Sequence, residues 1–353
     1  MSQTQFFLGG NTPDGFYSLY DGLSDPRQTE RLYILKGGPG CGKSTLLRRL
    51  GRHAKTAGLT TEQVLCSGDP DSLDALVIPK LRIAVADGTA PHVMEAACPG
   101  AVETYVDLSR FYRHDALRPL LDELTAAKTE YQAHYREAYR CLRAAGELRR
   151  SLAHPLDTPE LHRRLERRAR GIIGREIRPG SGGLLRQRFL SAVTCRGTVT
   201  LWDTVPTLAE RVYELEDSFG FAHVLLAPIL NAALDAGQPV IACPDPMAPE
   251  RLAHLILPEC SLAFLTSAPG CPWPHRADRR IRLDEAADGE VRRQYRSRSR
   301  FTRKVADSLL AESVHALEQA KFFHDRLEQL YHPHVDFDGV MRTADALADE
   351  ILP

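Results

Sequence analysis

The feature that most constrains the fold of this chain is a glycine-rich turn between an apolar run and a helical pattern. Residues 31–47 read RLYILKGGPGCGKSTLL, and the turn within them fits the pattern G-x-x-x-x-G-K-[ST] at positions 37–44. Glycines at these places let consecutive backbone N–H groups curl around an anion, because a Cβ would obstruct positive φ angles and close approach. The helix expected from Lys43 directs its free N-terminal N–H groups at the same anion. The stretch therefore predicts a phosphate-binding loop between a strand and a helix.

Two side chains extend this prediction from a phosphate to a nucleoside triphosphate with Mg²⁺. Lys43 is placed to reach the β- and γ-phosphates, and the Ser44 hydroxyl is placed to hold the metal ion. ATP is the first expectation for the nucleotide and GTP is the alternative, since no base-reading motif separates them. The residues expected to contact the nucleotide are Gly37, Gly38, Pro39, Gly40, Cys41, Gly42, Lys43, Ser44 and Thr45.

Bulk composition argues against several other classes of protein. The chain has 353 residues and a formal net charge of −1, so it is long enough for two domains and has no overall attraction for polyanions. Its first residues lack the basic and apolar regions of a signal peptide. The apolar stretch 224–234 is too short to span a bilayer and is interrupted by Pro228 and Asn231. The eight cysteines show no zinc-type spacing. We expect a cytoplasmic protein with reduced thiols and no membrane partner.

The order of local signals predicts alternating strands and helices, followed by a long helical region. A Pro-Asp-Gly turn at 13–15 indicates a hairpin, and the helix after the phosphate-binding loop should end near Gly58. Glycine and proline mark a flexible linker at 179–183. The remaining segments are strands at 63–66 and 83–86 and a helical pattern at 117–173 with a break at 154–155.

After the linker the same order of signals begins again. FLGGNTPDGFYSLYD from Phe7 returns as FLSAVTCRGTVTLWD from Phe189, and YILKGGPGCGKSTLL from Tyr33 returns as YELEDSFGFAHVLL from Tyr213. The offset stays close to about 180 residues, a period too long for a solenoid, which indicates a duplicated domain. The predicted division is an active domain at 1–178, a linker at 179–187 and a degenerate repeat at 188–353.

The comparison of the two copies distinguishes residues that are expected to act on the nucleotide from residues that maintain the fold. Gly220-Phe221-Ala222 stands where the first copy has Gly42-Lys43-Ser44, and Thr266-Ser267 replaces the aspartate at the end of the apolar strand. Landmarks such as Pro258 remain. The second copy lacks counterparts of four residues of the first copy: Lys43, Ser44, Asp87 and His92. One working nucleotide site is therefore expected, in the first copy.

At this point the chain resembles the P-loop NTPase superfamily over its first 110 residues or so. The doubled layout, with CSGDPDSLD and VADGTAPH in the first copy only, resembles a bacterial family of duplicated P-loop ATPase or nucleotide-binding proteins whose second copy is degenerate. The resemblance implies an α/β fold with a parallel sheet of P-loop NTPase type, duplicated, each copy followed by a helical hairpin and packed as a pseudo-twofold pair. It also implies binding of ATP or GTP.

Four further residues are candidates for chemistry around the phosphates. Asp87 ends an apolar strand, where it is expected to hold Mg²⁺; a turn-forming role before Gly88 is the alternative. Asp69 and Asp71 follow another strand and could orient water or accept a proton, although Asp71 could instead cap a helix starting at Ser72 and Asp69 could be structural. His92 could stabilise charge on the γ-phosphate. No glutamate follows Asp87, which is unlike many ATP-driven motors.

Arginines are concentrated in two runs, at 136–188 and 292–303. One of them could act as an arginine finger on the γ-phosphate. The runs could also contact a nucleic acid backbone, but no nucleic-acid motif accompanies them, so this is the weaker alternative. Solvated helix faces with internal ion pairs are the usual explanation of such runs.

The sequence as a whole predicts a Mg²⁺-dependent hydrolase of a nucleoside triphosphate with a single site. Two alternatives remain open. A small-molecule or nucleotide kinase would transfer the phosphate to an acceptor that the sequence does not name. A slow nucleotide-dependent switch or scaffold would change its affinity for a protein partner instead.

Overall fold

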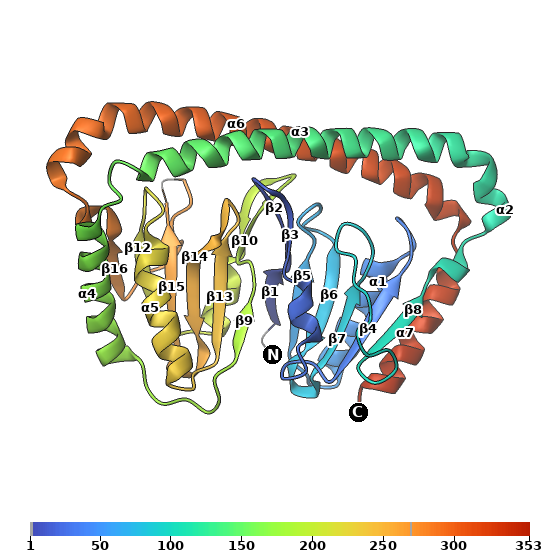
Figure 1. The fold of residues 1–353 in the computed structure, drawn as a ribbon. Coiled ribbons are helices and arrows are strands. Elements are labelled where there is room, and N and C mark those ends of the chain that lie inside the picture. Colours follow the sequence, from blue (N-terminus) through green and yellow to red (C-terminus); the bar gives the residue numbers. More distant parts are fainter. Residues whose placement is uncertain (1–2, 269) are drawn as a thin grey trace.

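The computed structural model describes residues 3–268 and 270–353, which form two α/β halves beneath a pair of long helices (Figure 1). The sheet of the first half has the strand order β1-β5-β6-β7-β4-β8. Its strands are β1 (Gln3–Phe7), β4 (Arg31–Lys36), β5 (Thr61–Leu65), β6 (Leu73–Ile78), β7 (Ile83–Asp87) and β8 (Glu103–Asp107).

The second half repeats this sheet strand for strand, in the order β9-β13-β14-β15-β12-β16. The relative directions of neighbouring strands are the same in both sheets. Its strands are β9 (Leu185–Gln187), β12 (Arg211–Glu216), β13 (Val240–Asp245), β14 (Ala248–Leu257), β15 (Leu262–Ser267) and β16 (Arg279–Arg282).

Each half also carries a hairpin of the kind that the Pro-Asp-Gly turn predicts. The pairs are β2 (Gly9–Thr12) with β3 (Gly15–Ser18) and β10 (Ser191–Thr194) with β11 (Gly197–Thr200). Gly15 and Gly197 have φ angles of 110° and 94°, which a residue with a Cβ rarely adopts. The two glycines thus occupy the same place in equivalent turns of the two halves.

The expectation of a parallel sheet is wrong for one strand in each half. β6 runs antiparallel to both β5 and β7, and β14 runs antiparallel to both of its neighbours. The cause is the short connection at 66–72, because a parallel strand would need a crossover of a dozen residues or more. Residues 73–78 form this buried strand, so the helix considered from Ser72 does not form.

The long helices pair with each other instead of forming a hairpin within each half, which corrects the second part of the predicted fold. α3 packs along α6 over both sheets, and the two lie side by side across the top of Figure 1. The break expected at 154–155 turns the chain from α3 into α4, which packs on the second half. The helices are α1 (Lys43–Thr56), α2 (His114–Leu117), α3 (Leu121–Ala153), α4 (Pro159–Glu176), α5 (Ala222–Asp235), α6 (Gly289–Tyr331) and α7 (Phe337–Ile351).

The last helix of each half packs on the other half. Tyr33 in β4 donates a hydrogen bond to Glu350 of α7 at 2.6 Å, and Tyr213 in β12 donates the matching one to Glu176 of α4 at 2.5 Å. Arg49 of α1 also donates to Asp345 of α7, at 2.8 Å. The core of the first half is therefore completed by the C-terminal end of the chain.

Equivalent residues of the two halves meet at the centre of the molecule. Phe7 and Phe189 exchange both of their backbone hydrogen bonds at 2.9 Å, and Asn11 donates to the carbonyl of Val193 at 2.9 Å. The segment 179–187 is also held in place: Gly180 donates to the carbonyl of Ala236 at 2.8 Å, and β9 joins the second sheet. Among the helices that the structure describes, none combines the length and apolarity needed to cross a membrane.

A buried histidine in the second sheet gives a prediction about acid stability. His254 accepts a hydrogen bond from the Thr266 N–H at 3.0 Å, and burial lowers the pKa of His254 from 6.5 to about 3. Between these values the unfolded chain binds a proton that the folded chain does not, so the free energy of unfolding falls as the pH drops below about 6.5. The loss from this residue should reach about 2–3 kcal/mol at pH 4.5.

Replacing His254 with asparagine, which keeps an acceptor for the Thr266 N–H, should remove this share of the acid sensitivity. Urea unfolding between pH 4.5 and 8 measures it. The exposed His114→Asn variant is the control and should follow the unaltered chain. Parallel pH profiles for all three proteins would contradict the prediction.

Candidate functional site

The glycine-rich loop lies between β4 and α1, as the sequence predicts. α1 begins at Lys43, and Gly42 at its N-terminal end has a φ angle of 88°. Gly40 has a φ angle of 67°, and a Cβ built there would lie 3.2 Å from the backbone oxygen of Glu328 in α6. No side chain among the described residues caps α1, so the N–H groups of its first turn have no side-chain acceptor and are available to a ligand.

The Lys43 ammonium lies under this loop and is directed at its backbone. It donates hydrogen bonds to the carbonyls of Gly37 at 2.7 Å and Gly38 at 2.9 Å. Its Nζ is also 3.5 Å from Oδ2 of Asp87, the last residue of β7. The ammonium thus lies between the glycine-rich loop and a buried carboxylate.

Three buried side chains meet beside Lys43 in a cluster that the sequence reveals only in part. Asp87 of β7, His92 from the loop after it and Asp74 of β6 offer ligand atoms within 4.8 Å of one another. Tyr20 donates a hydrogen bond to Asp74 at 3.0 Å. Neither ring nitrogen of His92 has a hydrogen-bond partner among the described residues, although both are buried. This Asp74–Asp87–His92 cluster is the strongest candidate for metal binding or proton transfer.

Burial governs the protonation of the cluster. Burial, assisted by the negative charge of Asp87, raises the pKa of Asp74 from 3.8 to about 7, while the Tyr20 hydroxyl and Lys43 oppose the rise. Burial also lowers the pKa of His92, against the attraction of Asp87. His92 is therefore neutral near pH 7 and has a nitrogen lone pair to offer, and Asp74 gains or loses its proton readily.

Ser44 lies next to this cluster. Its Oγ accepts a hydrogen bond from the N–H of Leu73 at 2.9 Å, and Leu73 is the neighbour of Asp74 in β6. The hydroxyl is thereby fixed at the N-terminal end of α1, against the first residue of the strand that carries Asp74. Thr45, also expected to contact the nucleotide, is exposed on the first turn of α1.

The two candidate bases in the loop after β5 point to other partners. Asp69 lies 3.4 Å from the ammonium of Lys321 in α6. Asp71 is exposed and pairs with Arg196 from the turn of the β10–β11 hairpin. The structure thus brings together Lys43, Asp87 and His92, whereas Asp69 and Asp71 contact α6 and the second half.

Sequence reasoning missed Asp74, although the internal comparison contains a signal for it. The register of β6 with β7 pairs Ala75 with Ala86, and that of β14 with β15 pairs His254 with Leu265. Asp74 therefore corresponds to Ala253, so this carboxylate is missing from the second half together with the others. The same test that selected Asp87 and His92 would have selected it.

The corresponding loop of the second half is filled by its own carboxylate. Asp217 is buried and accepts hydrogen bonds from the N–H groups of Phe219 at 3.1 Å, Gly220 at 2.8 Å and Ala222 at 2.7 Å. Gly220 has a φ angle of 83°, close to that of Gly42. Within the described residues, no carboxylate accepts from the N–H groups of Gly40 or Gly42. One loop is open to an anion and the other already contains one.

Comparison of this chain with protein-family models, with curated proteins and with solved structures found no match. The site is therefore interpreted from its own residues and from the contrast between the two halves.

Proposed function

We propose that the first half binds a nucleoside triphosphate together with Mg²⁺ and hydrolyses its γ-phosphate, with ATP as the first candidate and GTP as the alternative. The observation that carries this proposal is the difference between the two loops. The loop before α5 holds the carboxylate of Asp217 against its N–H groups, whereas the loop before α1 is open and has Lys43 beside it. An open ring of N–H groups at a helix N-terminus favours a phosphate.

The phosphates would be held mainly by backbone and by one charge. The N–H groups of the loop would contact the β-phosphate, and Lys43 would turn from the carbonyls of Gly37 and Gly38 to the β- and γ-phosphate oxygens. Phosphoryl transfer needs positioning and electrostatic stabilisation more than covalent chemistry from the protein. A loop fixed between a buried strand and a helix supplies both.

The residues around Lys43 fit a magnesium ion. Ser44, Asp74 and Asp87 offer the hard oxygen ligands that Mg²⁺ prefers, and a cation beside the two buried carboxylates would add to the positive charge of Lys43. The raised pKa of Asp74 supports this reading, because a cation would let that carboxyl ionise. When bound, Mg²⁺ would neutralise charge on the β- and γ-phosphate oxygens. His92, whose ring nitrogens have no hydrogen-bond partner among the described residues, is the better candidate than Asp71 to orient the attacking oxygen.

We also infer that the chain is an internal duplication of a P-loop NTPase-type unit whose second copy has kept only its scaffold. The equal strand orders and the equivalent hairpins support this inference. A nucleotide-dependent switch is the second candidate function, and one contact favours it. The loop lies against the backbone of Glu328 in α6, a helix that reaches over both halves. A change in the occupied loop could therefore move a helix that both halves share.

Calorimetric titration with Mg²⁺-ATP tests the proposal, with GTP titrated beside it. We expect one nucleotide per chain, since Asp217 fills the second loop, and steady release of phosphate from the bound nucleotide. Binding without release would shift the assignment to the switch or to a kinase that awaits an acceptor. A stoichiometry of two, or no binding of either nucleotide, would contradict the single-site proposal.

A further inference from the structure

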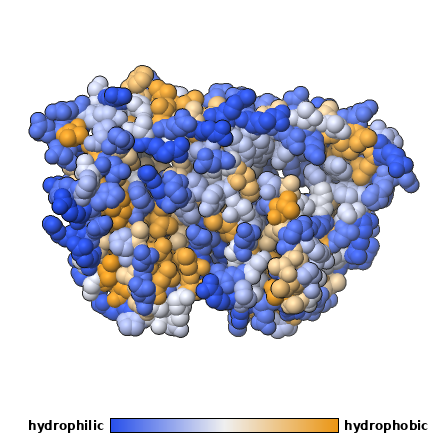
Figure 2. All heavy atoms as spheres, in the orientation of Figure 1, coloured by the Kyte–Doolittle hydropathy of each residue, from blue (hydrophilic) through white to orange (hydrophobic). Residues whose placement is uncertain are grey.

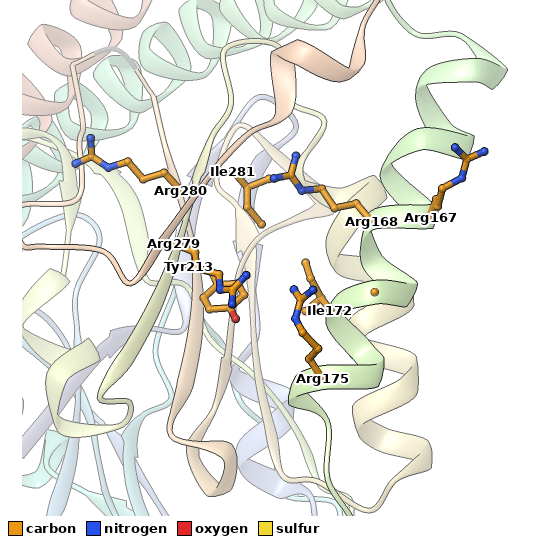
Figure 3. Close-up of a pocket in the computed structure, with 9 residues that line it drawn as sticks. Arg167, Arg168, Ile172, Arg175, Tyr213, Arg279, Arg280 and Ile281 are labelled. Atoms are coloured by element: carbon orange, nitrogen blue, oxygen red, sulfur yellow. The ribbon is translucent and has the colours of Figure 1, made fainter.

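A groove lined by arginines lies far from the loop, between α4 and the edge of the second sheet. It has a volume of about 440 Å³, and Figure 3 shows Arg168 extending from α4 toward Ile281 of β16. The arginines that line it are Arg167, Arg168, Arg175, Arg279 and Arg280. We refer to this set as the arginine groove.

Three of these five arginines have no ion-pair partner among the described residues. Arg280 pairs with Glu214 at 2.9 Å, and Arg175 lies 3.9 Å from Glu176. Within the described part of the chain, no carboxylate lies within ion-pair distance of Arg167, Arg168 or Arg279. Arg279 instead lies over the ring of Tyr213, with 5.5 Å between the guanidinium carbon and the ring centroid. Like charges held close together repel one another, so an external anion would stabilise this arrangement.

The first half is an internal control that shows the arginines are not required by the architecture. β8 pairs with β4 as β16 pairs with β12, and this register matches Thr104 with Arg279 and Asp107 with Arg282. The helix at the same place is α7, whose one arginine, Arg342, is accompanied by four acidic residues. α4 has six arginines and three acidic residues. The same framework thus carries opposite charge in the two halves.

The basic surface continues beyond the groove. A second depression of about 370 Å³ shares Arg175 and adds Arg178 and Arg211, together with the carboxylates of Glu176 and Glu259. A third, on α6, is lined by Arg300, Arg303, Lys304 and Asp307, and Phe301 in the same stretch of α6 is 70% exposed. Between positions 276 and 304 the chain has eleven basic and five acidic residues, against a net charge of −1 for the whole chain. Hydrophilic side chains cover the left edge of the molecule, over α4, in Figure 2.

We propose that the arginine groove binds the phosphodiester backbone of a single-stranded nucleic acid. An open groove with guanidinium groups spaced along a helix and a strand suits a chain of phosphates better than one small anion. The exposed Phe301, in the basic stretch of α6, offers a face on which an unpaired base can stack. Ile172 and Ile281 are buried, so the groove itself presents no aliphatic side chain that could insert into an anionic membrane. Phe301 lies outside the groove, and binding to anionic vesicles is therefore measured beside binding to the oligonucleotide.

Fluorescence anisotropy of the full chain with a labelled single-stranded DNA of about 20 nucleotides tests this proposal. The groove variant is Arg167→Gln/Arg168→Gln/Arg279→Gln. Its matched control has the same charge change at three exposed arginines without ion pairs: Arg52→Gln/Arg136→Gln/Arg143→Gln. We expect the groove variant to bind about tenfold more weakly or worse. The negative slope of log K against log salt should become less steep by about 2, since each lost contact removes about 0.7 from its magnitude. The control should keep its affinity within about twofold.

Three results would overturn the proposal: no binding of the oligonucleotide at low salt, an equal loss in both triple variants, or loss of binding to phosphatidylglycerol vesicles with oligonucleotide binding unchanged. Circular dichroism and thermal unfolding check that the variants are folded. If the groove variant is not folded, the single exposed Arg168→Gln change should still reduce the magnitude of the salt slope by about 0.7. An unchanged slope in that variant would equally reject the proposal.

Discussion

Replacing Lys43 with alanine should lower phosphate release from Mg²⁺-ATP by about 10²–10³-fold, the loss typical of one preorganised donor to a developing charge. The Lys43 ammonium lies at the loop, held by the carbonyls of Gly37 and Gly38 and 3.5 Å from Asp87. Without it, the triphosphate would face the buried Asp74 and Asp87 with less positive charge to separate them. Nucleotide affinity should fall with turnover, which a fluorescent nucleotide analogue measures.

Lys55 supplies the matched control, because it is exposed near the other end of the same helix. Lys55→Ala removes the same charge from α1 and should retain turnover and affinity. Thermal unfolding of both variants separates a local loss from a global one. Equal phosphate release by the Lys43→Ala variant and the unaltered chain would show that the loop is not the site of hydrolysis.

The parts of the fold that the sequence predicts correctly depend on local signals. α1 begins at Lys43 because glycine and the helix-forming residues after it meet there, and α3 ends at Ala153, just before the His154-Pro155 step. The hairpin around Gly15 follows from the turn chemistry of its own residues. Each of these features is decided within a few positions of the chain.

The features of the fold that the sequence does not predict depend on contacts between residues that are far apart in the sequence. β6 is a continuous buried strand whose direction follows from the shortness of the 66–72 connection, and its LDALVI reads neither as an alternating strand nor as a helix. The packing of α7 on the first half joins Tyr33 to Glu350, more than 300 residues apart. No local pattern encodes which of two similar sheets a helix will cover.

In the candidate site, too, the residues predicted from the sequence depend on local spacing, and those not predicted depend on distant contacts. The loop residues and Asp87 follow from spacing, whereas the meeting of Asp74 with His92 depends on a strand that was not anticipated. The contact of α6 with Gly40 could not be predicted either, because a helix face gives no indication of a partner nearly 290 residues away. Asp71 shows the converse: it follows a strand as a base should, yet its carboxylate pairs with Arg196 of the other half.

Removing the Asp217 carboxylate from the second loop should lower the free energy of unfolding by about 2–4 kcal/mol. In an Asp217→Ala variant, the N–H groups of Phe219, Gly220 and Ala222 lose their acceptor, and α5 loses its charged N-terminal partner. Urea unfolding measures the change. Asp203→Ala, at an exposed carboxylate of the same half, is the control and should change the free energy of unfolding by less than about 0.5 kcal/mol.

The same variant tests whether the two loops are equivalent anion sites. Once the carboxylate is gone, the vacated N–H groups should accept inorganic phosphate, since they stand at a helix N-terminus with Gly220 at a positive φ angle. Added phosphate should then raise the melting temperature of the Asp217→Ala variant by more than it raises that of the unaltered chain or of Asp203→Ala. If phosphate stabilises all three proteins equally, the second loop is not a filled phosphate site. The difference between the loops would then no longer support a nucleotide at the first.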